Sequence, residues 1–161
     1  MHDKKILNEQ LISSTVEIAK LAGEGITEIY NSDFDYQLKK DLSPITAADN
    51  LSHNIITDRL KMLTPEIPIL SEENCDIPYK IRSQWTQYWL VDPLDGTKEF
   101  IKKNGEFTVN IALIENNNPI FGIIHIPVTN ETYWGSQVNG SFYSNKNNDV
   151  ERIRVSENHQ N

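Results

Sequence analysis

The chain has 161 residues, about one domain's worth, with 38% hydrophobic and 24% charged residues and a formal net charge of −8. This composition excludes collagenous, disulfide-rich and low-complexity chains, and the acidic balance disfavours non-specific nucleic-acid binding. The lone cysteine, Cys75, cannot form an internal disulfide. With no apolar leader or long apolar run, we expect a cytoplasmic protein, with peripheral association with the inner membrane left open.

Two amphipathic helices are predicted at the start of the chain. Apolar residues recur at helical spacing over residues 5–30, and the polar stretch 31–45 is predicted to be a loop. A second helix is predicted to begin near Thr46, because Thr46 and Asp49 resemble a capping box, and to end before Pro65.

From residue 67 the pattern changes to short strands separated by turn signals, including Asn139-Gly140. Strands are predicted at residues 67–70, 88–91, 107–114, 120–128, 133–134, 142–143 and 153–155. The chain contains no repeat and no dividing linker. This order predicts an α+β fold with two N-terminal helices packed on a largely antiparallel sheet.

The most informative stretch is Asp-Pro-Leu-Asp-Gly-Thr at residues 92–97, which ends an apolar strand. By itself this run is typical of a turn. Glu72, however, also follows a short apolar strand, so a shared sheet would bring acidic strand ends together. A bound cation is the usual reason to tolerate clustered carboxylates, and Mg²⁺ prefers carboxylate and carbonyl oxygens. Backbone N–H groups at the start of a helix after Gly96 would suit a phosphate.

Three elements in order resemble the inositol monophosphatase-like, lithium-sensitive phosphatase superfamily. They are the Asp-Pro-Leu-Asp-Gly-Thr run, the upstream Ser-Glu-Glu at 71–73, and the Thr-x-x-Asp element ending at Asp49. The longer stretches 88–101 and 104–114 resemble its branch of bacterial 3′(2′),5′-bisphosphate nucleotidases. The resemblance implies the N-terminal subdomain of a layered α/β/α/β/α sugar-phosphatase fold over residues 1–155. Residues 156–161 would be a tail where a C-terminal subdomain begins.

The resemblance also implies the metal ligands. Glu72, Asp92 and the carbonyl of Leu94 would bind a first Mg²⁺. Asp92 would bridge to a second Mg²⁺, which Asp95 helps to hold. Two such ions suit phosphoryl transfer, which depends on positioning and on neutralising developing charge.

The remaining implied roles concern water and substrate. Thr97 would orient the attacking water, and Asp49 would hydrogen-bond Thr97 and support deprotonation. The N–H groups of Gly96 and Thr97 would hold phosphate oxygens, and Glu72 would also contact the substrate. Without the motif, Asp49 has the simpler interpretation of a helix cap.

The sequence departs from the family at its later part. Members continue further and carry a W-D-x-A-A-G-like element whose aspartate completes the second metal site, whereas no tryptophan here is followed by aspartate. We therefore expect a complete first metal site, an incomplete second one, and an exposed apolar edge or face that promotes self-association.

The resemblance favours Mg²⁺-dependent, Li⁺-sensitive hydrolysis of 3′-phosphoadenosine 5′-phosphate to AMP and phosphate, a reaction of sulfur metabolism. The first alternative is an inositol or sugar monophosphatase on the same scaffold. The second is a non-catalytic metal-binding remnant or a fragment of a longer enzyme. The metal motifs do not separate these alternatives.

Overall fold

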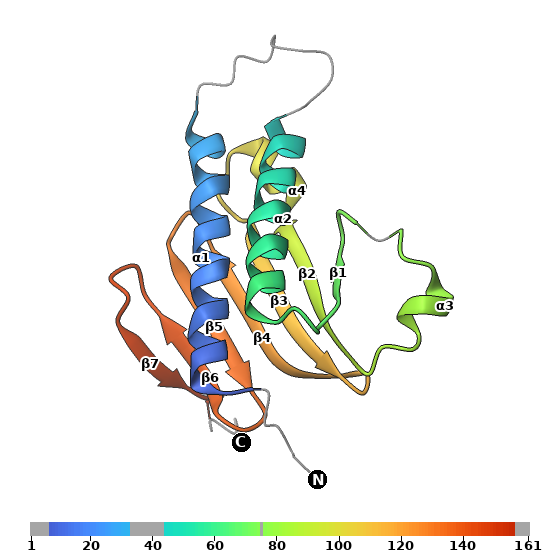
Figure 1. Ribbon diagram of the computed structural model, residues 1–161. Helices are drawn as coiled ribbons and strands as arrows, with labels where there is room; N and C mark the ends of the chain where they lie inside the picture. Colours follow the sequence, from blue (N-terminus) through green and yellow to red (C-terminus); the bar gives the residue numbers. More distant parts are fainter. Residues whose placement is uncertain (1–6, 33–43, 75, 157–161) are drawn as a thin grey trace, which may run out of the picture.

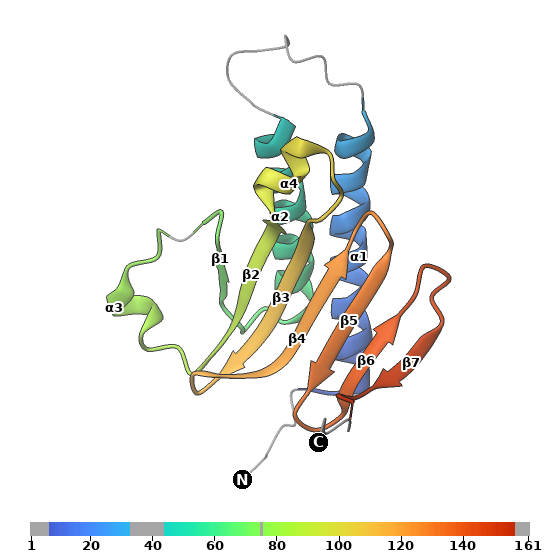
Figure 2. The same ribbon diagram turned by 180° about the vertical axis from the view of Figure 1, so that it is seen from behind.

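A computed structural model describes residues 7–32, 44–74 and 76–156 of the chain. Two long helices lie side by side on one face of a seven-stranded sheet, and the opposite face carries no helix in the described part of the chain (Figures 1 and 2). In chain order the elements are α1 (Glu9–Asn31), α2 (Pro44–Leu63), β1 (Ile69–Ser71), α3 (Tyr79–Arg82), β2 (Gln87–Asp95), α4 (Thr97–Lys102), β3 (Thr108–Glu115), β4 (Asn118–Ile126), β5 (Glu131–Ser136), β6 (Gly140–Ser144) and β7 (Val150–Ile153).

The strands follow one another across the sheet in sequence order. β1 pairs with β2 in parallel, and every later pair is antiparallel. Tight turns make this meander possible: Asn116 and Asn117 have φ angles of 49° and 63°, and Gly140 has 82°, as hairpin turns require. The predicted α+β fold with a largely antiparallel sheet is confirmed.

The core lies between the helices and the sheet. Asn8 caps α1 by accepting a hydrogen bond from the backbone N–H of Leu11 at 2.8 Å. Two glycines near the C-terminal end of α1 lie in close contact with side chains of β4 and α2. A Cβ on Gly23 would lie 2.5 Å from the His125 ring, and one on Gly25 would lie 3.1 Å from the Leu51 side chain. Small residues therefore let α1 approach both β4 and α2.

Several elements differ from the sequence-based expectation, and most strand ends are shifted by a few residues. α2 begins at Pro44, before Thr46, because proline lacks the N–H that the first helical turn leaves unpaired. The stretch expected to be a plain connection contains the short helix α3. β2 runs through Asp95 instead of ending at Val91, with a register shift between Asp92 and Asp95.

The face of the sheet opposite the helices exposes apolar side chains. Leu90 is 43% exposed, Ile124 49% and Tyr133 37%. Ala112 and Gly122 pair in register between these strands, so small residues leave this face hollowed. The expected exposed apolar face is therefore present. No helix in the described ranges is long and apolar enough to cross a membrane.

Candidate active site

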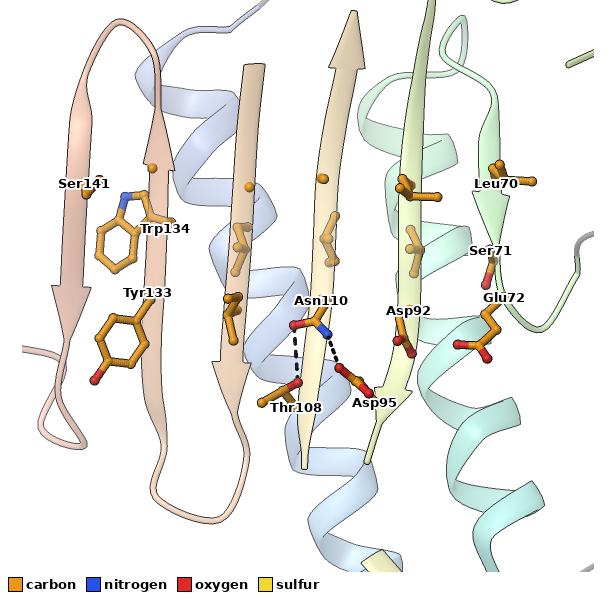
Figure 3. A pocket seen from close by; sticks show the side chains of 18 of the residues that line it. Leu70, Ser71, Glu72, Asp92, Asp95, Thr108, Asn110, Tyr133, Trp134 and Ser141 are labelled. Carbon is orange, nitrogen blue, oxygen red and sulfur yellow. Dashed lines mark hydrogen bonds between the residues drawn. The ribbon is translucent and has the colours of Figure 1, made fainter. Parts of the chain in front are cut away.

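Two acidic strand ends meet at one edge of the sheet, because β1 and β2 run parallel. Ser71 pairs with Val91 in register, and the N–H of Glu72 donates to the Val91 carbonyl at 3.0 Å. Glu72 and Asp92 thus follow paired residues, and Figure 3 shows their carboxyl groups on neighbouring strands at the same level. The expectation that these two carboxylates come together is met.

Asp92 is half-buried, and its Oδ1 atom is fully buried with no hydrogen-bond partner. The pKa of Asp92 rises to about 7, first because burial disfavours the charged form and then because Glu72 and Asp95 repel it. A hydrogen bond from the Leu94 backbone offsets part of this rise. Among the described residues, no ion pair offsets the charge of the Asp92 carboxylate.

Asp95 is the last residue of β2 and is exposed. Its Oδ2 accepts a hydrogen bond of 3.2 Å from Asn110 Nδ2, and Asn110 Oδ1 accepts one of 3.3 Å from Thr108 Oγ1 (Figure 3). Asn110 also pairs in register with Asp92. Sequence reasoning missed Asn110, although a lone amide within the apolar strand β3 was a usable signal.

Local packing fixes the turn that carries the aspartates. The buried hydroxyl of Ser52, on α2, donates a 2.8 Å hydrogen bond to the Pro93 carbonyl. Leu94 inserts its side chain into the core and is 4% exposed. Gly96 has a φ of 99°, and a Cβ there would lie 2.9 Å from the Glu106 carbonyl oxygen, so only glycine fits without strain.

Asp49 projects from α2 towards the same acidic region. Its pKa rises to about 6, because it is partly buried and because Glu73 and Glu72 add negative charge. Thr97 is the first residue of α4 and is exposed. No hydrogen bond joins Asp49 to Thr97 in the described part of the chain, so their joint role stays a prediction.

The oxygen donors of Glu72, Asp92 and Asp95 suit a hard divalent cation, although the described residues do not form a complete set of metal ligands. Among the described residues, no group of three His, Cys, Asp or Glu side chains already stands in metal-binding geometry. The unpartnered Asp92 Oδ1 and the oxygen-only chemistry of Glu72, Asp92 and Asp95 are nevertheless what Mg²⁺ requires. Asp95 is turned to Asn110, whose amide group holds its Oδ2.

A cavity of about 1080 Å³ opens beside these carboxylates on the helix-free face of the sheet. Its walls include Glu72, Asp92 and Asp95 at one side, and Leu90 and Arg82 nearby. This volume lies just above the range of about 300–1,000 Å³ typical of small-molecule sites. Sequence reasoning did not anticipate Arg82, because the helix that carries it was not predicted.

Comparison with known proteins gives a consistent result. A family profile described as "Inositol monophosphatase family" matches residues 7–161. The 3′(2′),5′-bisphosphate nucleotidase CysQ of Escherichia coli K12 is 50% identical over 126 residues, covering 76% of this chain and 50% of that protein. CysQ of Aggregatibacter actinomycetemcomitans is 40% identical over 150 residues, covering 93% of this chain and 55% of that protein.

Among solved structures, the crystal structure of CysQ from Bacteroides thetaiotaomicron aligns with a TM-score of 0.80 at 38% identity. The match covers 94% of this chain and 55% of that one. SuhB from Bartonella henselae aligns with a TM-score of 0.74 at 27% identity, over 93% and 56% of the two chains. The chain spans about half the length of the curated relatives it matches.

Proposed function

The chain belongs to the inositol monophosphatase family, and from this premise we propose that it carries the metal-binding part of a CysQ-like nucleotidase. The reaction would be hydrolysis of 3′-phosphoadenosine 5′-phosphate to AMP and phosphate in the cytoplasm. The observation that carries the proposal is the meeting of Glu72 and Asp92, with the unpartnered Asp92 Oδ1 between acidic neighbours. The likeness to CysQ proteins supports the choice of a nucleotide substrate.

In this proposal, Glu72, Asp92 and the Leu94 carbonyl would hold one Mg²⁺, and Asp92 with Asp95 would contribute to a second. When bound, Mg²⁺ supplies Lewis acidity that activates water and neutralises charge on the leaving oxygen. Asn110 would hold Asp95 in place through its 3.2 Å hydrogen bond.

The substrate-facing roles belong to the turn after β2. The backbone N–H groups of Gly96 and Thr97, with Glu72, would contact the phosphate that is cleaved. The Thr97 hydroxyl would orient the attacking water, and Asp49 would hydrogen-bond Thr97 and support deprotonation of that water. Burial and the nearby Glu72 and Glu73 raise the pKa of Asp49 to about 6, which brings it closer to the pH where a general base is most effective.

We also propose self-association through the apolar patch formed by Ala112, Gly122, Ile124 and Tyr133 on the helix-free face of the sheet. The occupant would be a second copy of the chain, because the same patch is present on every copy and can pair with itself about a two-fold axis. The acidic residues lie at the β1–β2 end of this face, away from Tyr133 (Figure 3). A two-fold pairing can therefore keep the two acidic ends apart.

Phosphate release tests the proposed function. We would compare 3′-phosphoadenosine 5′-phosphate with inositol 1-phosphate, at varied Mg²⁺, for the wild-type chain and Asp92→Asn. The proposal predicts Mg²⁺-dependent and Li⁺-sensitive release from the nucleotide, lost in Asp92→Asn. Release from inositol 1-phosphate instead would favour a sugar monophosphatase. No release from either compound, with Mg²⁺ still bound, would favour a non-catalytic remnant.

A further inference from the structure

Arg82 differs in the sign of its charge from the other charged residues that line the large cavity. Among the described lining residues it is the only lysine or arginine, whereas Glu72, Asp92 and Asp95 supply negative charge. It is the last residue of α3, which lies beyond β1 at the edge of the sheet in both views (Figures 1 and 2). The side chain therefore reaches the cavity from the β1 side.

Within the described ranges, the guanidinium group of Arg82 has no counter-charge. Its Nε atom is buried and has no hydrogen-bond partner. No carboxylate lies within 4.0 Å of it in the described ranges, where the one ion pair joins Lys20 to Glu17. The centroid of the Tyr79 ring lies 5.9 Å from Arg82 Cζ. An unpaired buried donor is costly, and a bound anion would remove that cost.

Apolar residues of two neighbouring strands also line the cavity. Leu70 and Leu90 pair in register on β1 and β2, and both line the cavity. Asp92 follows Leu90 on the same face of β2, about 6.6–6.8 Å further along the strand. The lining of the cavity thus combines acidic residues suited to a cation, apolar residues of β1 and β2, and one arginine that approaches from the β1 side. A molecule with two anionic groups joined by a sugar ring matches this combination.

We propose that Arg82 binds the phosphate that is not cleaved and so selects nucleoside bisphosphates over monophosphates. This inference rests on the proposed function, since it assumes that the cleaved phosphate lies at Glu72 and Asp92. Guanidinium groups suit the task because their planar set of N–H donors matches phosphate oxygens. Arg82 would set specificity and take no part in bond cleavage.

Binding of two ligands to the wild-type chain and Arg82→Gln tests this inference. Calorimetry in Mg²⁺, with inhibitory Li⁺ added so that the ligands are not cleaved, would compare 3′-phosphoadenosine 5′-phosphate with adenosine 3′-monophosphate, which lacks the phosphate assigned to Arg82. We expect Arg82→Gln to weaken bisphosphate binding about 10- to 100-fold, the loss of a charge-assisted hydrogen bond, and to leave 3′-monophosphate binding unchanged. Arg59→Gln, at an exposed position on α2, is the matched control and should change neither.

Equal weakening of both ligands, or no change in either, would overturn the inference, as would a wild-type chain that does not prefer the bisphosphate. If Arg82→Gln does not fold, Arg82→Lys keeps the charge without the planar donors and should lose part of the preference. A bisphosphate preference that depends on Arg82 without any phosphate release would support the inference and contradict the proposed function. Phosphate release from the bisphosphate that neither Arg82 variant changes would support the proposed function and contradict the inference about Arg82.

Discussion

The Ser52 hydroxyl on α2 and the Pro93 carbonyl on β2 form a buried 2.8 Å hydrogen bond between residues 41 apart in sequence. Pro93 lies between Asp92 and Asp95 in the chain. The bond therefore ties the helix layer to the turn that carries both aspartates. It also satisfies a carbonyl oxygen inside the core, where an unpaired acceptor would be costly.

Ser52→Ala should destabilise the fold by about 1–3 kcal/mol, because it leaves the Pro93 carbonyl buried without a partner. Urea unfolding measures this change. Ser13→Ala, which removes an exposed hydroxyl on α1, is the matched control and should change the free energy of unfolding by less than about 0.5 kcal/mol. Equal effects of the two substitutions would show that the Ser52 bond has no special role.

Gly96→Ala should destabilise the protein by about 1–3 kcal/mol. The φ of 99° disfavours any side chain, and the added Cβ would lie 2.9 Å from the Glu106 carbonyl oxygen. Gly122→Ala is the control, because a Cβ there has no neighbour within 4 Å. Thermal unfolding of the two variants should differ clearly, with Gly122→Ala close to wild type. A Gly96→Ala protein as stable as wild type would contradict the strained turn.

His125 should make stability depend on pH. Burial, and then the charge of Lys20, lowers its pKa from 6.5 to about 4, so the unfolded chain binds the proton more tightly. The contribution of neutral His125 to the free energy of unfolding is fully present above pH 6.5 and is lost as pH falls towards 4. Between pH 7.5 and 5 this amounts to about 2 kcal/mol.

Urea unfolding of wild type and His125→Gln at these two pH values isolates the histidine. The raised pKa values of Asp49 and Asp92 act in the opposite direction, and they act equally in both proteins. The difference between the two proteins should therefore shrink by about 2 kcal/mol at pH 5. A constant difference would show that His125 is not held neutral by the fold.

Self-association should depend on the apolar patch. Ile124→Lys places a charge on the helix-free face, where Ile124 is 49% exposed, and should shift the protein towards monomer in sedimentation velocity. Met62→Lys, at an 83% exposed position on α2, is the control and should leave association unchanged. A wild-type protein that is monomeric at all concentrations would contradict the proposal of self-association.

The sequence predicted the elements that follow simple periodicity. The buried stripe of α1, the strands β3 and β4, and the turn at Asn139-Gly140 all appear in the structure. The meeting of Glu72 with Asp92 was also predictable, because both follow apolar strands that share a sheet.

The parts that sequence did not predict depend on contacts between distant residues. The Ser52 hydrogen bond to Pro93 and the Asn110 hydrogen bond to Asp95 join separate elements, and no local sequence pattern predicts them. β2 continues past Val91 because β3 pairs with it again at Asp95 after a register shift. The helix of Arg82 is four residues long, too short to show a periodic pattern.

Isothermal titration of Mg²⁺ into the metal-free protein tests the central claim most directly. Asp58→Asn, an exposed carboxylate on α2, serves as the control for Asp92→Asn. We expect wild type and Asp58→Asn to bind Mg²⁺ equally and Asp92→Asn to lose about 10-fold or more in affinity, since one buried charged ligand is removed. If Asp92→Asn binds Mg²⁺ as tightly as wild type, the carboxylates at the ends of β1 and β2 are not the metal site.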